Sequence, residues 1–269
     1  MRCCRNFLSL LPFVAMIMWG EIAYAADRVA LRTQIEALRD QGEHIKARPL
    51  AEQLLELSKR VNGPQSAETA DALRILGVLK LELGEMPPIT LLLEALAIDE
   101  QVVPRDDKVI ATDLRNLGLA QRNMGDLLSA SKYFKRALVL DEQLGLKDEI
   151  ALDLSLLGGV YRRTGQVQDA VDILQRVIAI REKAEPPQEI SLARDVSELA
   201  QALAMGLSFR ESEAQFKRAI ELDERNTGQN SPTTAANLNS LARLYIRWLR
   251  AEDNPERFET TQAGPAMAQ

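Results

Sequence analysis

The sequence has little sulfur, a single histidine and few aromatic residues. Both of its cysteines, Cys3 and Cys4, lie at the very start of the 269 residues, and His44 is its one histidine. The rest of the chain therefore has no disulfide, no thiolate nucleophile and no zinc site built on sulfur. Aromatic residues make up 4% of the chain, which is too few for a β-sandwich or barrel, whereas its many Ala, Leu, Glu and Arg residues favour helices.

The first 25 residues have the pattern of an export signal. Arg2 and Arg5 precede an apolar run over residues 7–19, and Ala23-Tyr24-Ala25 then has the small-x-small form that signal peptidase cuts. This apolar run is shorter than the about 20 residues that span a bilayer. We expect a signal peptide over 1–25, cleavage after Ala25 and a periplasmic or secreted protein. Membrane attachment follows only if the segment stays uncleaved as an anchor.

Charge and motif content exclude several classes of function. The formal charge is −6, and the first 25 residues contribute +1, so the expected mature chain carries −7. This balance argues against nucleic acid as a partner. No glycine-rich phosphate loop or nucleophile–base set is present, so we predict no catalytic residue, metal, cofactor or small-molecule substrate. The acidic pairs at 141–142 and 223–224 are interpreted as solvated helix faces, rather than as Ca²⁺ ligands or acid–base pairs.

Two short motifs recur at one interval along the chain. The segment YFKRALVLDE (133–142) returns as QFKRAIELDE (215–224), and related segments begin at 50, 91 and 173, giving steps of 41, 42, 40 and 42 residues. The second motif keeps the same interval, as LRILG (73–77), LRNLG (114–118), LSLLG (154–158), VSELA (196–200) and LNSLA (238–242). Five near-copies at one period indicate a repeat array rather than a duplicated domain.

Each repeat reads as two helices separated by a glycine. Gly42, Gly84, Gly125 and Gly165 stand where a left-handed residue ends the first helix. The fifth repeat has Gly206 one position early and Leu207 at the aligned place, so we expect a different turn there. A last helix over roughly 232–249 has no second helix after it. We expect it to cap the array, with Trp248 and Leu249 packed inward and a disordered tail over 251–269. The alternative for these two side chains is a small apolar docking patch.

These repeats resemble tetratricopeptide repeats. The fourth shows it most clearly, with Leu154-x2-Leu157-Gly158-x2-Tyr161 followed by Ala170-x3-Leu174. The longer period is similar to that of kinesin light chains, although their cytosolic transport role does not follow for a chain with an export signal. The resemblance covers about residues 28–249. It implies an all-α fold, a right-handed α-solenoid of about five helix pairs over residues 26–250 with a C-terminal capping helix.

The resemblance also implies a binding surface, because first helices line the concave groove of such arrays. The groove positions of this chain that carry Arg or Asn are Arg74, Arg115, Asn116, Arg122, Asn123, Arg162, Arg163, Asn239, Arg243 and Arg247. Guanidinium groups grip carboxylates in two places, so we predict a scaffold, not an enzyme, that binds an extended or helical, acidic or carboxylate-bearing segment of a protein partner. The alternative for these arginines is pairing with neighbouring acids. The alternative function is an oligomeric envelope assembly protein that uses its ends or convex face.

Overall fold

The computed structural model describes residues 11–85 and 88–253, which form eleven α-helices and no strand. The all-α expectation is therefore confirmed. The chain divides between Leu140 and Asp141 into two compact parts, and each is described by itself.

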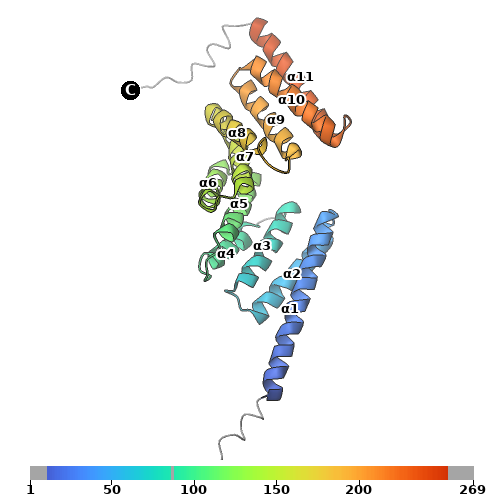
Figure 1. Ribbon diagram of the computed structural model, residues 1–269, viewed down its shortest axis with the longest axis vertical. Helices are drawn as coiled ribbons and strands as arrows, with labels where there is room; N and C mark the ends of the chain where they lie inside the picture. The colour runs from blue at the N-terminus through green and yellow to red at the C-terminus, as the bar shows by residue number, and fades with distance from the viewer. Residues whose placement is uncertain (1–10, 86–87, 254–269) are drawn as a thin grey trace, which may run out of the picture. The chain divides into compact units, whose positions relative to one another are not determined.

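The first part consists of helices that pack in consecutive pairs (Figure 1). Its elements are α1 (Leu11–Asp40), α2 (His44–Val61), α3 (Ala67–Glu82), α4 (Ile89–Asp99), α5 (Asp107–Asn123) and the beginning of α6 (Leu127–Leu144). Helix α1 packs on α2 and α3 on α4, and α2 and α4 also contact the pair that follows. Ile35, Leu54 and Leu73 are buried in one core cluster that joins α1, α2 and α3, so each helix buries an apolar stripe against two neighbours.

The second part repeats this arrangement. Its elements after α6 are α7 (Lys147–Arg163), α8 (Val167–Arg181), α9 (Glu189–Met205), α10 (Phe209–Thr227) and α11 (Pro232–Asp253). Helix α7 pairs with α8 and α9 with α10, while α11 packs mainly on α10. Trp248 stacks on Phe209 with ring centroids 5.8 Å apart, as expected for a side chain that packs inward. The same expectation is wrong for Leu249, which is 61% exposed because it lies on the side of α11 that no described helix covers.

Two boundaries were expected from the sequence, the end of the signal peptide after Ala25 and the start of the tail at residue 251. Helix α1 continues through the junction of Ala25 and Ala26, and cleavage there stays a prediction. Across residues 11–85 and 88–253, no helix combines the length and apolar character that crossing a membrane requires. Residues 251–253 belong to α11, which corrects the start of the expected tail, and the rest of that tail lies outside the described residues.

The turns between paired helices share one backbone form. Gly42, Gly84, Gly125 and Gly165 have φ between +69° and +87°, as the sequence predicts. The expectation of a different fifth turn is wrong, because Leu207 itself adopts φ +64°. In this turn the Ser208 amide donates to the Leu203 carbonyl at 3.0 Å. A left-handed leucine costs about 1–2 kcal/mol, so the repeat geometry prevails over the preference of this residue.

Close approach explains the glycine at the same repeat position of α3, α5 and α7. A Cβ added to Gly158 would lie 2.7 Å from Leu174 Cγ, one added to Gly77 would lie 2.8 Å from Leu92 Cδ2, and one added to Gly118 would overlap the Phe134 ring. Each bulky residue belongs to the second helix of the same pair. Because glycine has no side chain, it leaves the space that a side chain of the second helix fills.

Adjacent glycines in α7 allow a matched test of this contact. Both Gly158→Ala and Gly159→Ala gain about 0.5–1 kcal/mol of helix propensity, but only Gly158 faces a neighbour, since a Cβ on Gly159 meets no atom within 4 Å. We expect Gly159→Ala to stabilise the fold and Gly158→Ala to be less stable than Gly159→Ala by about 1–3 kcal/mol from overpacking. Urea unfolding of both variants measures the difference, and equal free energies of unfolding would contradict the close-approach account.

Candidate functional site

Polar side chains are buried between consecutive pairs at two fixed repeat positions. One is the residue just before the first apolar residue of the first-helix motif, and the other is the ninth residue of the second-helix motif. Their occupants in the later repeats are Asp113, Asp153, Asp195 and Asn237 at the first position, and Asp99, Asp141, Arg181 and Asp223 at the second. Because buried ionised groups are stable only when paired, these positions define a polar network within the array.

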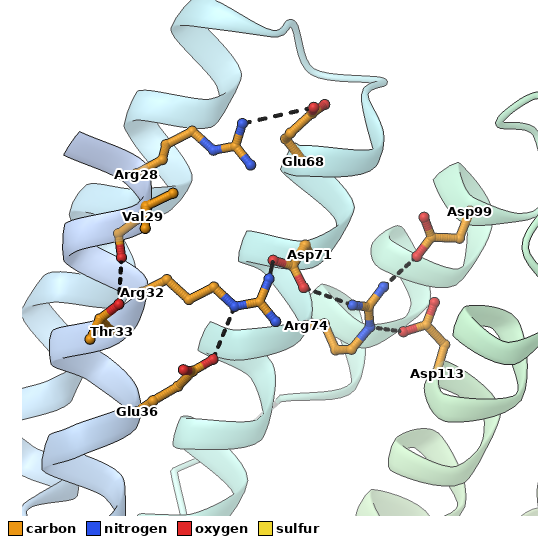
Figure 2. Close-up of polar contacts among 10 residues, drawn as sticks. All are labelled: Arg28, Val29, Arg32, Thr33, Glu36, Glu68, Asp71, Arg74, Asp99 and Asp113. Carbon is orange, nitrogen blue, oxygen red and sulfur yellow. Dashed lines mark hydrogen bonds and ion pairs between the residues drawn. The ribbon is translucent and has the colours of Figure 1, made fainter. Parts of the chain in front are cut away.

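In the first part this network centres on Arg74 (Figure 2). The Arg74 guanidinium donates from Nε to Asp113 at 2.5 Å, from Nη2 to Asp99 at 2.5 Å and from Nη1 to Asp71 at 2.9 Å. Asp71 also accepts from Arg32 of α1 at 2.7 Å. The Arg74 side chain is only 14% exposed, so its donors are committed to carboxylates of three helices.

The second part satisfies the same positions with other residues. Asp195 accepts from Arg181 Nε and from the Ser155 hydroxyl, both at 2.5 Å. In the next repeat, Asn237 donates to Asp223 at 2.8 Å and accepts from the Ser197 hydroxyl at 2.5 Å.

The occupants of the two positions change together. Where the second helix supplies Arg181, the first helix supplies an aspartate; where it supplies Asp223 and no arginine is near, the first helix supplies a neutral amide. At these two interfaces the charges are thereby matched locally.

The interpretation of the acidic pairs as solvated faces is wrong for their aspartates. Asp141 is fully buried and Asp223 is 6% exposed. The neighbouring Glu142 is exposed to solvent and accepts from Arg176 at 2.7 Å. Glu142 thus fits the interpretation, whereas Glu224 is half-buried and both aspartates are buried.

Asp113 carries the clearest electrostatic signature in the network. Burial raises its pKa to about 7, against the lowering effect of Arg74, and the neighbouring Asp99 adds to the rise. Its second oxygen, Oδ2, is buried without a hydrogen-bond partner. One guanidinium cannot compensate two buried carboxylates fully, so Asp113 holds a proton to a higher pH than an exposed aspartate does.

A hollow lies beside this network in the first part. It has a volume of about 460 Å³ and is lined by Arg28, Arg32, Ala67, Glu68, Asp71, Arg74, Asp99, Val102, Pro104, Asp106 and Val109. Arg28 lies 3.8 Å from Glu68, and its buried Nε has no hydrogen-bond partner. The lining carries three cationic and four anionic side chains, so it does not form the basic groove that the sequence predicted.

The predicted partner-binding residues of the first part lie mostly at packed positions. Arg115 is buried, Arg74, Asn116 and Arg122 are half-buried, and Asn123 is exposed. Arg115 and Arg122 each make a further polar or electrostatic contact. The alternative of pairing with neighbouring acids thus describes Arg74, and a binding role for the others stays a prediction.

The predicted residues of the second part are more accessible. Arg162 pairs with Glu198 of α9 at 2.6 Å. Arg163, Asn239 and Arg243 are exposed and Arg247 is half-buried. Sequence spacing brings Arg163 to the end of α7 and the other three to α11.

Comparison with known proteins settles the family. The family model described as tetratricopeptide repeat matches residues 28–101 and 108–183, together more than half of the chain. The chain belongs to the tetratricopeptide repeat family. Its tetratricopeptide repeats form an α-solenoid fold, which supports a role as a protein-interaction scaffold. No curated protein sequence matches the chain significantly.

Solved structures with low sequence identity share the fold. Repeats of a kinesin light chain from Podosopora anserina match with a TM-score of 0.63 and 20% identity, covering 76% of this chain and 98% of that one. BtubC from P. vanneervenii matches with a TM-score of 0.61 and 16% identity, covering 89% of this chain and 95% of BtubC. A Rap protein in complex with Competence and Sporulation Factor matches with a TM-score of 0.58 and 16% identity, covering 85% of this chain and 66% of the Rap protein. The expected likeness to the repeats of kinesin light chains is thereby confirmed at the level of the fold.

Metal binding finds no support in the described part of the chain. No group of three or more His, Cys, Asp or Glu side chains there could hold an ion. The carboxylates of the network instead face guanidinium, amide and hydroxyl donors.

The raised pKa of Asp113 predicts a pH-dependent stability. The folded state binds more protons than the unfolded state between an unfolded pKa near 4 and a folded pKa of about 7. The free energy of unfolding should therefore fall as pH rises through this window, by on the order of 2–4 kcal/mol. Asp113→Asn, the residue type found at the equivalent Asn237, should remove that fall. Urea titrations from pH 4 to pH 9 compare the two chains, and parallel profiles would refute the assignment.

Arg181 allows the buried network to be tested against a surface ion pair. Arg181→Leu leaves Asp195 buried without a cation, and we expect a loss of about 3–5 kcal/mol. Arg176→Leu removes an exposed partner of Glu142 and should cost no more than about 1 kcal/mol. Adding Asp195→Asn to Arg181→Leu should recover much of the loss, because an amide needs no cation. Thermal unfolding that shows equal losses for the two single variants would be inconsistent with this network.

Proposed function

We propose that the chain is an exported scaffold, without enzymatic activity, that holds a segment of a protein partner against its first helices. The segment is extended or helical and is acidic or carboxylate-bearing. The tetratricopeptide repeat family supports a role in protein interaction, and the Rap protein complex supports by analogy the binding of a ligand by such an array. The leading segment with its Ala23-Tyr24-Ala25 site supports export.

The observation that carries the acidic preference is a set of unmatched cations in the second part. Arg163, Arg243 and Arg247 form no ion pair with any described residue, whereas Arg162 beside them is matched by Glu198. Guanidinium groups that lack an internal carboxylate offer planar, bidentate donors to an external one. A partner segment that brings Asp, Glu or a terminal carboxylate would complete them.

Gly159 gives this face room for a partner. It lies in the middle of α7, four residues before Arg163 and on the same side of the helix. A mid-helix glycine lowers helix stability, and unlike Gly158 it has no neighbour that a Cβ would meet. Space here therefore serves no packing contact of this chain and permits close approach of a partner backbone.

The test compares two charge-reversed variants of equal net charge. Arg163→Glu with Arg243→Glu should reduce partner capture at least about tenfold, because two donors become repulsive. Arg210→Glu with Arg225→Glu, on exposed and unpaired positions of α10, should leave capture unchanged. Affinity capture from an envelope extract, quantified by mass spectrometry, measures both. The free energy of unfolding of each variant should differ from that of the original chain by no more than about 0.5 kcal/mol per substitution.

Capture that is equal for the two variants would disprove the acidic preference. Raising the salt concentration should weaken capture by the original chain, because exposed charges are screened beyond about 8–10 Å. N-terminal sequencing of the chain isolated from the same extract tests export independently. A first residue other than Ala26 would contradict the predicted cleavage.

A further inference from the structure

Helix α11 has the first-helix motif of a sixth repeat that lacks a described second helix. Leu238, Leu241, Ala242 and Tyr245 repeat the spacing of Leu154, Leu157, Gly158 and Tyr161. In the complete repeats, the small residue of this motif faces a bulky side chain of the second helix, as Gly158 faces Leu174. At α11, the residues around the small position are exposed instead, with Leu238 at 49%, Ile246 at 52% and Leu249 at 61%.

These exposed residues form one continuous face. The α11 apolar face consists of Ala235, Leu238, Ala242, Tyr245, Ile246 and Leu249. At 3.6 residues per turn they cover an arc of about 100°. The opposite side of α11 is already occupied, because Leu244 packs with Phe216 and Ala200 in a buried cluster. The Tyr245 hydroxyl also donates to Glu213 of α10 at 2.6 Å, whereas the other residues of the apolar face are additional to the surface that attaches α11 to the array.

An acidic residue without an ion-pair partner in the described part of the chain, Glu224, lies at the end of the helix on which α11 packs. Consecutive second helices are joined by the same ion pair in successive repeats: Arg136 with Glu100, Arg176 with Glu142, and Arg218 with Glu182. The next acceptor in the series is Glu224 at the end of α10, which is half-buried and has no ion-pair partner among the described residues. The missing donor belongs to the helix that would cover α11.

We propose that the α11 apolar face and Glu224 together dock one amphipathic helix of a partner protein. The pattern of the helix follows from the complete repeats, where Phe134 precedes Arg136 by two residues and follows the buried Ala130 by four. The docked helix carries a small residue, then a bulky apolar residue four positions later that lies over Ala242. An Arg or Lys two positions further on pairs with Glu224.

Two other occupants fit this pattern less well. Residues 254–269 place Phe258 sixteen residues after Ala242, as Phe134 stands after Gly118, but Thr260 replaces the arginine and Gln262 replaces the apolar Leu138. A symmetric contact between two copies of α11 would present the first-helix motif twice and would supply no second-helix arginine to Glu224 in the register of Arg218. Charge complementarity therefore favours a partner helix with a basic residue in this register.

A synthetic peptide of residues 127–144, LLSASKYFKRALVLDEQL, serves as the probe because it carries the full pattern. Fluorescence anisotropy of the labelled peptide with the full chain should show saturable binding. Phe134→Ala in the peptide, or Ala242→Glu in the chain, should weaken binding at least about tenfold. The matched variant Ala236→Glu lies on an exposed position of α11 outside the apolar face and should bind as the original chain does.

A charge exchange tests the register. Glu224→Arg in the chain should weaken binding of the peptide. Arg136→Glu in the peptide should restore binding to the Glu224→Arg chain but not to the original chain. Binding that is indifferent to Ala242→Glu, or a missing restoration, would overturn the proposal. So would tighter binding after Phe258→Ala, which would make the C-terminal segment the occupant, or a dimer in sedimentation that Ala242→Glu dissociates. None of these substitutions touches Arg163 or Arg243, so this surface and the proposed groove can fail separately.

Discussion

Close approach of two helices at a small residue is the contact on which the rest of the array depends. Packed helices lie about 8–10 Å apart, and a glycine at this point lets a whole leucine or phenylalanine side chain fill the remaining gap. This contact fixes where the second helix lies relative to the first. It thereby decides which side chains meet the next pair, and the burial of the polar positions follows from it.

The polar network shows how the array satisfies charges at its interfaces. An uncompensated buried charge costs several kcal/mol, and each interface in a repeat protein touches only its neighbours. The matching must therefore be local, as the pairing of Arg181 with Asp195 and of Asn237 with Asp223 shows. Inner positions of the first helices divide in consequence. Those next to the network hold the array together, and those at the end of α7 and on α11, such as Arg163 and Arg243, are exposed to solvent.

Sequence periodicity predicted the helix pairs, the small residues and four of the turn glycines, because each of these depends on local backbone or on one repeated contact. Burial of Asp141 and Asp223 was not predicted, since acidic residues at helix ends are usually solvated. A signal was present: the polar residue before each first-helix motif recurs as Asp113, Asp153, Asp195 and Asn237. The partners of Arg74 could not be read from the sequence, because a long side chain reaches whichever of three helices the packing brings near.

At the C-terminal end of the array the polar groups of the network are satisfied, but the apolar face of α11 is exposed. Its polar network ends on a neutral amide, Asn237, which satisfies Asp223 without demanding a further charge. Its apolar packing does not end in the same way. A terminal repeat that only keeps the array soluble needs a polar outer face, whereas α11 exposes leucine and isoleucine side chains in the register of a helix contact. Their exposure beside Glu224, which has no ion-pair partner among the described residues, supports the proposed docking of another helix on this face.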